Sequence, residues 1–163
     1  MAKRTILRIG GIRVRAGETQ DIRLKVSESY TGDPVRLGVR AIRSRRAGPT
    51  VLVTAAIHGD EMNGTGIIHE LMFSDALQLT RGTLILVPVV NIVGFEAQMR
   101  YMPDRRDLNR NFPGSPTGSL TRRVSYTFFE EVVRHCDFGL DLHTAAAQRT
   151  NYPNVRGDLT NAE

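Results

Sequence analysis

The fold is decided by Thr50-Val51-Leu52-Val53-Thr54-Ala55-Ala56, which is followed directly by Ile57-His58-Gly59-Asp60-Glu61. The first seven residues form a continuous apolar run, which is typical of a strand buried on both faces, as in a parallel sheet. The next five residues carry an imidazole and two carboxylates. Since ligands of open α/β sheets gather beyond the carboxyl ends of the strands, this position predicts a functional site.

The segments on either side of this strand indicate an α/β protein. Before it, residues 1–47 alternate apolar and polar side chains between turn sequences, which predicts a β-rich N-terminal lead-in. After it, the apolar spacing predicts a helix at 63–73, a buried strand at 83–90, an amphipathic helix at about 119–134 and a third buried strand at 137–142. This order predicts a three-layer α/β/α fold with a mostly parallel or mixed sheet, in a domain that covers residues 48–163.

Three details refine these elements. The 63–73 helix has one apolar face, formed by Ile67, Ile68, Leu71 and Met72. Pro88 lacks a backbone N–H, so the second strand either lies at a sheet edge there or is already leaving the sheet. His69 lies within a helical run and His135 in the last turn of a helix, so both are interpreted as structural.

The composition fits one folded domain. The chain has 163 residues, of which 40% are hydrophobic and 24% charged, as expected for a globular domain. Its one cysteine excludes a disulfide scaffold, and Cys136 is interpreted as a small buried hydrophobe. No stretch approaches the roughly 18 apolar residues of a membrane span, and the N-terminus lacks the apolar part of a secretion signal, so we expect a cytoplasmic protein with no membrane partner.

The net charge of +5 is concentrated near the N-terminus, where residues 1–50 hold 12 of the 22 Lys and Arg. In Ile12-Arg13-Val14-Arg15 the charges alternate with apolar residues, which is typical of a half-buried strand with a solvated basic face. The only aromatic residue in this third is Tyr30. Because single-strand binding surfaces combine basic groups with aromatic ones, no nucleic-acid partner is expected.

Two imidazoles and a carboxylate are predicted to converge beyond the sheet. His58 and Glu61 stand three residues apart at a strand-to-helix turn, and His143 follows the strand at 137–142. Neighbouring parallel strands bring their carboxyl ends together, and two His with one Glu and an open fourth position are typical of catalytic zinc. Taken alone, His58 and Glu61 also fit a hydrogen-bonded turn histidine and a first-turn acid of the next helix.

Residues 91–118 form a polar segment without periodicity that is long enough to suggest a function. Within it, Asn109-Arg110 fits a clamp for an anionic substrate, because the guanidinium matches a carboxylate with two parallel hydrogen bonds. Arginine can also polarise a carbonyl and stabilise the oxyanion that forms from it. The same segment also fits a charged surface loop with turn residues.

Several motifs occur together in one order: Gly48-Pro49-Thr50, His58-Gly59-Asp60-Glu61, Asn63-Gly64, Gly82-Thr83-Leu84, Pro88-Val89-Val90-Asn91, Asp107-Leu108-Asn109-Arg110, Phe112-Pro113-Gly114 and Asp141-Leu142-His143-Thr144. Through them the chain resembles the succinylglutamate desuccinylase/aspartoacylase family of the zinc carboxypeptidase superfamily. The resemblance implies a zinc-dependent amidohydrolase that holds one zinc ion per chain. Its substrate would be a small N-acyl amino acid, from which it removes the acyl group.

The resemblance also implies roles for individual residues. His58, Glu61 and His143 correspond to the zinc ligands, and Asp107 corresponds to a carboxylate that orients the first ligand histidine.

Further along the same segment, the resemblance implies that Asn109 and Arg110 bind the carboxylate of the substrate. Arg100 is the choice for the residue that polarises the scissile carbonyl, with Arg105 and Arg106 as close alternatives.

Family members run to roughly twice this length, and the resemblance places their general base, a Glu, in the half that follows. Losing general acid–base help typically costs ~10²–10⁴ in rate, so this polypeptide alone is expected to bind metal better than it turns over substrate. The alternative function is therefore a metal- or ligand-binding remnant that lacks this Glu. A sheet cut part way leaves an exposed edge that favours self-association, so a homo-oligomer is also expected.

Overall fold

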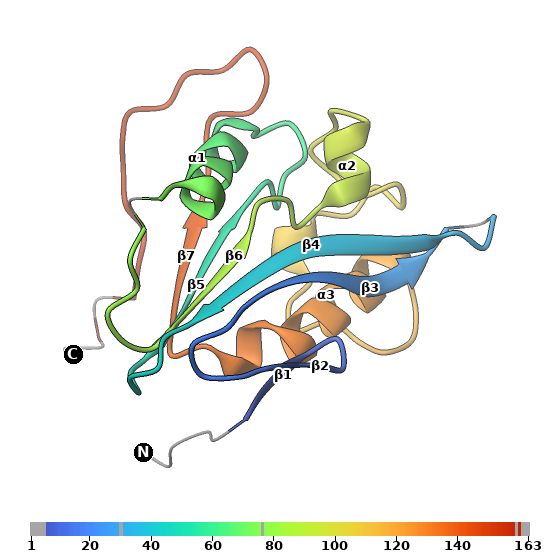
Figure 1. Cartoon of the computed structure of the whole chain (residues 1–163). Coiled ribbons are helices and arrows are strands. Elements are labelled where there is room, and N and C mark those ends of the chain that lie inside the picture. The colour runs from blue at the N-terminus through green and yellow to red at the C-terminus, as the bar shows by residue number, and fades with distance from the viewer. Residues whose placement is uncertain (1–5, 30, 76, 159, 161–163) are drawn as a thin grey trace.

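The computed structural model describes residues 6–29, 31–75, 77–158 and 160 (Figure 1). Its strands are β1 (Leu7–Ile9), β2 (Ile12–Val14), β3 (Thr19–Glu28), β4 (Pro34–Arg43), β5 (Thr50–Ala55), β6 (Thr83–Val87) and β7 (Phe138–Leu142). Its α-helices are α1 (Asn63–Phe73), α2 (Ile92–Glu96) and α3 (Leu120–Glu131), and 3₁₀ turns lie at Leu108–Arg110 and Val133–His135. None of these helices is long and apolar enough to cross a membrane.

Five strands form one mixed sheet in the order β3-β4-β6-β5-β7. The β3–β4 and β4–β6 pairs are antiparallel, whereas β5 runs parallel to both β6 and β7. Helices α1 and α3 lie on opposite faces of this sheet (Figure 1). The predicted three-layer α/β/α fold with a mixed sheet is therefore confirmed.

Helices α1 and α3 each pack over a separate hydrophobic core. On the α1 face, Ile68 packs with Val53 and Ala55 of β5 and with Leu86 of β6. On the α3 face, the larger core is formed by side chains that include Leu52, Ile85, Val87, Val124 and Phe128. Because successive side chains of a strand point to opposite faces, β5 supplies both cores, as its apolar run predicted.

Of the N-terminal strands, β3 and β4 belong to the five-stranded sheet, whereas β1 and β2 form a separate two-stranded sheet. β3 alternates exposed and buried residues, with Ile22, Leu24 and Val26 buried against the α3 side. β4 then joins β6 through pairs such as Ala41 with Ile85. The small β1–β2 hairpin is attached to α3, because Glu131 accepts a hydrogen bond from the Gly10 amide over 2.8 Å.

Two predictions about burial were wrong. β7 was expected to be a buried strand, but it lies at the edge of the sheet, and Phe138 and Leu140 are more than half exposed. Ile67 was placed on the buried face of α1, yet it is 55% exposed while its neighbour Ile68 is fully buried. Pro88 behaves as expected, because β6 ends at Val87 and the chain leaves the sheet there.

Candidate metal centre

The loop after β5 is shaped by a left-handed residue and a close backbone contact. Ala56 has φ +48°, and its carbonyl accepts a hydrogen bond from the Asn91 amide over 2.9 Å. Gly59 lies so near α2 that a Cβ there would be 2.1 Å from the carbonyl carbon of Gly94. These contacts fix the turn that carries His58 and Glu61 beyond the carboxyl end of β5.

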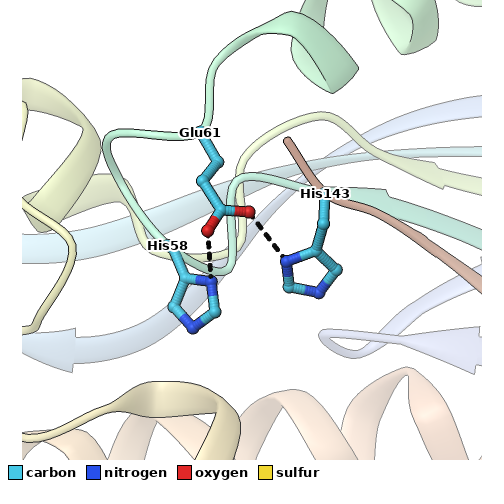
Figure 2. Close-up of side chains that lie close together, drawn as sticks. All are labelled: His58, Glu61 and His143. Carbon is cyan, nitrogen blue, oxygen red and sulfur yellow. Dashed lines mark hydrogen bonds and ion pairs between the residues drawn. The ribbon is translucent and has the colours of Figure 1, made fainter. Parts of the chain in front are cut away.

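His58, Glu61 and His143 form a compact cluster at this end of the sheet, with Glu61 between the two imidazoles (Figure 2). His58 Nδ1 lies 3.0 Å from Glu61 Oε1, and His143 Nδ1 lies 2.8 Å from Glu61 Oε2. One ligand atom from each of the three residues lies within 4.8 Å of the others. The structure therefore brings together the three residues that the sequence singled out as metal ligands.

A carboxylate holds the far nitrogen of each imidazole. His58 Nε2 lies 3.2 Å from Asp107 Oδ1, and His143 Nε2 lies 2.7 Å from Asp141 Oδ2. Metal-binding histidines commonly donate their second N–H to a carboxylate, which fixes the tautomer and the ring orientation. In both residues this arrangement leaves Nδ1 on the side of Glu61.

The donor set fits a divalent metal ion. Two imidazole nitrogens and one carboxylate oxygen are groups that borderline metals such as zinc accept together. His58 and Glu61 are only 3% and 4% exposed, so they form a preorganised part of the site, whereas the His143 side chain is 37% exposed. A carboxylate among two imidazoles with outer carboxylate partners is the arrangement expected of a metal centre rather than of an ordinary helix start.

Protonation of the cluster follows from these contacts. The hydrogen bond to Asp141 outweighs burial and, together with Glu61, raises the pKa of His143 to about 9. Burial acts to raise the pKa of Glu61, but hydrogen bonds from His143 and Arg100 and the neighbouring His58 lower it below its ordinary 4.5. Because a ligand imidazole must be deprotonated, binding of a metal ion here would be coupled to loss of the His143 proton.

Arg100 is the arginine that reaches the cluster. Its Nη1 donates to Glu61 Oε1 over 2.7 Å, and its Nη2 lies 3.9 Å from Asp107 Oδ2. The Arg100 carbonyl accepts a hydrogen bond from the buried side chain of Asn91, which ties this segment to α2. Arg105 and Arg106, the two alternatives, are exposed residues of the following turn.

Asn109 and Arg110 follow Asp107, and neither makes a hydrogen bond or ion pair with His58, Glu61 or His143. They belong to the 3₁₀ turn that begins after Asp107, whose Oδ1 accepts a hydrogen bond from the Asn109 amide over 2.9 Å. Arg110 is exposed, and its Nη1 lies 3.3 Å from the Asn109 carbonyl. The same aspartate oxygen therefore contacts both the His58 imidazole and the amide at the start of this turn.

Sequence reasoning missed two groups at the site. Asp141 holds His143, and the Thr144 amide donates to Glu61 Oε2 over 3.1 Å. The aspartate had a detectable signal, because residues two apart along a strand point to the same face. The amide had none, since every residue except proline carries one.

Fold and site together define an α/β protein with a candidate metal centre beyond the carboxyl ends of β5 and β7. The sequence model of the Succinylglutamate desuccinylase/Aspartoacylase catalytic domain matches residues 47–162, and the chain belongs to this family.

Individual relatives agree with this assignment. An N-alpha-acetyl-L-2,4-diaminobutyric acid deacetylase from Halomonas elongata is 38% identical over 101 residues, which are 61% of this chain and 30% of that protein. The product-bound structure of the ectoine utilization protein EutE (DoeB) from Ruegeria pomeroyi matches with a TM-score of 0.73 and 32% identity over 88% of this chain and 44% of that one. The structure of a succinylglutamate desuccinylase from Silicibacter sp. TM1040 matches with a TM-score of 0.74 and 30% identity. The match covers 90% of this chain and 45% of that one. The chain thus spans less than half the length of these relatives.

Proposed function

We propose that the protein is a zinc-dependent deacylase, which hydrolyses the amide bond of a small N-acyl amino acid. The observation that carries the proposal is the His58–Glu61–His143 cluster, in which both imidazoles face one carboxylate. The family assignment supports it, because the relatives carry the names of deacetylases and desuccinylases. Zinc, when bound, supplies Lewis-acid chemistry for hydrolysis.

In this proposal the carboxylates orient the metal ligands, and the arginine stabilises charge that develops on the substrate. Asp107 and Asp141 keep the two imidazoles in the tautomer that leaves Nδ1 free to bind metal. Arg100 places a positive charge beside the cluster, where it can stabilise the oxyanion that develops from the scissile carbonyl.

Recognition of the substrate falls to the turn after Asp107. Asn109 and Arg110 supply an amide and a guanidinium, which together can bind the carboxylate of an amino acid. The deacetylase from Halomonas elongata is named for an acetylated diamino acid. We therefore propose N-acetylated diamino acids as the first substrates to test, with succinylglutamate and acetylaspartate as alternatives.

A second function deserves a test, namely metal binding without turnover. Among the described residues, the carboxylates that contact the imidazoles are Glu61, Asp107 and Asp141, and each is already engaged with a histidine. Glu130 and Glu131 lie on α3 and pair with Arg134 and with the Gly10 amide. Within the part of the chain that the structure describes, no free carboxylate contacts either imidazole, which favours a chain that holds zinc but hydrolyses slowly.

One experiment separates the two functions. The zinc-loaded protein is incubated with N-acetyl-diaminobutyrate, N-succinylglutamate and N-acetylaspartate, and the released amine is measured. Hydrolysis of any of them that disappears in Arg100→Ala, while zinc content stays unchanged, supports the deacylase. Full zinc occupancy with no amine released identifies the binding protein, and absence of zinc contradicts both.

A further inference from the structure

Thr54 is a buried polar side chain in the middle of an apolar strand. It is 6% exposed, and the other residues of β5 from Val51 to Ala55 are apolar. On the adjacent strand β6 it is paired with the fully buried Val87. Burying a hydroxyl among such neighbours costs free energy unless the hydroxyl makes a hydrogen bond. A threonine at this position, where valine would fit the strand equally well, therefore needs a partner.

That partner is the carboxylate of Asp141. β5 and β7 are parallel, and their register sets Thr54 opposite Asp141, so both side chains point to the same face of the sheet. The Thr54 hydroxyl donates to Asp141 Oδ1 over 2.7 Å. The other carboxylate oxygen, Oδ2, lies 2.7 Å from His143 Nε2. One carboxylate thus connects a buried hydroxyl of the central strand to an imidazole of the site.

The two outer carboxylates of the site are held in different ways. Asp107 Oδ1 contacts both His58 Nε2 and the Asn109 amide, so a backbone group fixes this carboxylate. Asp141 is fixed instead by a side chain, which binds the oxygen that does not face the imidazole. A carboxylate with one oxygen bound cannot rotate about its Cβ–Cγ bond without breaking that hydrogen bond. Thr54 therefore determines the direction in which Asp141 Oδ2 faces.

We infer that Thr54 is a positioning residue of the metal centre, which acts through Asp141 on His143. The inference rests on the proposed function, because His143 is one of the three candidate metal ligands. By fixing the carboxylate, the hydroxyl keeps the imidazole turned with Nδ1 toward Glu61, 2.8 Å from Oε2. The hydroxyl acts at one remove, since its hydrogen bond is to Asp141 and not to the imidazole.

Calorimetric titration of Thr54→Val with zinc tests the inference. Valine keeps the shape of the side chain but cannot donate, so zinc affinity should fall about 3–10-fold, less than the roughly 10–100-fold expected when the carboxylate itself is replaced. Thr54→Ser keeps the hydroxyl and should restore most of the affinity. Thr65→Val is the matched control, because the Thr65 hydroxyl donates to the Pro88 carbonyl, and it should bind zinc as the natural chain does. Unchanged affinity in Thr54→Val overturns the inference.

A double-mutant cycle tests whether Thr54 acts through Asp141. In an Asp141→Ala background the hydroxyl has no carboxylate to orient, so adding Thr54→Val should leave zinc affinity unchanged. A merely structural role of Thr54 would lower the affinity by the same factor in both backgrounds. That result contradicts the inference.

Nuclear magnetic resonance of the zinc-free protein separates this inference from the proposed function. The ring signals of His143 should shift or broaden in Thr54→Val and return in Thr54→Ser, while those of His69, which packs on Phe73, stay unchanged. Unaltered His143 signals overturn the inference. A natural chain that binds no zinc, but whose His143 signals respond to Thr54→Val, supports the positioning role and contradicts the zinc-dependent function.

Discussion

His58 and His143 follow neighbouring parallel strands and meet at one carboxylate, yet their surroundings differ. His58 follows the central strand β5, is 3% exposed and lies in a loop packed against α2. His143 follows the edge strand β7, and its side chain is 37% exposed. The first histidine is held by packing as well as hydrogen bonds, whereas the second depends mainly on Asp141 and Glu61.

This contrast assigns different tasks to the two halves of the site. The half formed by His58 and Glu61 is rigid and sets the geometry. The half formed by Asp141 and His143 is more exposed to solvent. Changes in packing on the buried side should therefore reduce the stability of the fold more than changes on the exposed side.

The largest effect on folding is expected from Gly59→Ala. A methyl group there meets the backbone of Gly94, which cannot move without displacing α2, so the free energy of unfolding should fall by about 1–3 kcal/mol. Urea denaturation measures the change.

The matched control is Gly66→Ala in α1, where an added Cβ has no neighbour within 4 Å. Since alanine favours a helix over glycine by roughly 0.8–1.0 kcal/mol, this variant should be at least as stable as the natural chain. If the two variants have the same free energy of unfolding, the result contradicts tight packing of the His58 loop against α2.

The two outer carboxylates allow a direct comparison of the halves. Asp107→Asn and Asp141→Asn each keep the side-chain shape and remove the charge that orients an imidazole. Metal affinity should fall about 10–100-fold in each, roughly 1.4–2.7 kcal/mol, as is typical for such partners. Calorimetric titration with zinc gives the affinities.

Each outer carboxylate also accepts a second hydrogen bond. Asp107 Oδ1 accepts from the Asn109 amide over 2.9 Å, and Asp141 Oδ1 accepts from the buried Thr54 hydroxyl over 2.7 Å, so both variants should also lose some stability. Asp33→Asn, in the β3–β4 turn, is the control and should leave zinc affinity unchanged. Unaltered affinity in both site variants would show that the carboxylates do not orient the ligands.

A smaller effect is expected at Asp104, which holds the segment between Arg100 and Asp107 to α3. It accepts hydrogen bonds from the amide and hydroxyl of the buried Thr121. Burial acts to raise the pKa of Asp104, but these hydrogen bonds outweigh it and lower the pKa below its ordinary 3.8. Asp104→Asn should therefore cost about 0.5–1.5 kcal/mol at pH 7.

The sign of the pH dependence follows from the lowered pKa. The contribution of Asp104 is complete above the unfolded value near 3.8 and is lost as the pH falls through the lower folded value. The stability difference between the natural chain and Asp104→Asn should thus shrink from pH 7 toward pH 2 in urea titrations. A difference that grows in acid contradicts this account.

The sequence predicted most of the fold, because the dominant signals are local. The apolar run at 50–56 identified the central strand, and the alternation of apolar and polar residues over 1–47 indicated half-exposed strands such as β3. The exposure of Ile67 and of β7 could not be predicted, since apolar periodicity records which residues could be buried. Whether another element covers them depends on the order of strands in the sheet.

The candidate site was predictable where residue types and spacing carry the information. His58 and Glu61 lie close in sequence, and His143 was placed by the rule that parallel strands end at one edge. The family resemblance favoured Arg100 over Arg105 and Arg106, but residue types alone could not separate them, because all three lie in an irregular segment. Their separation depended on the Asn91 hydrogen bond to the Arg100 carbonyl, which only the folded chain reveals.

The metal content of purified variants tests the central claim most directly. Elemental analysis should find about one zinc per chain in the natural protein, and near-background zinc in His58→Ala and His143→Ala, because the site needs all three ligands. His69→Ala, which removes an imidazole that packs on Phe73 in α1, should keep its zinc. Equal metal in all four proteins would contradict the proposed centre.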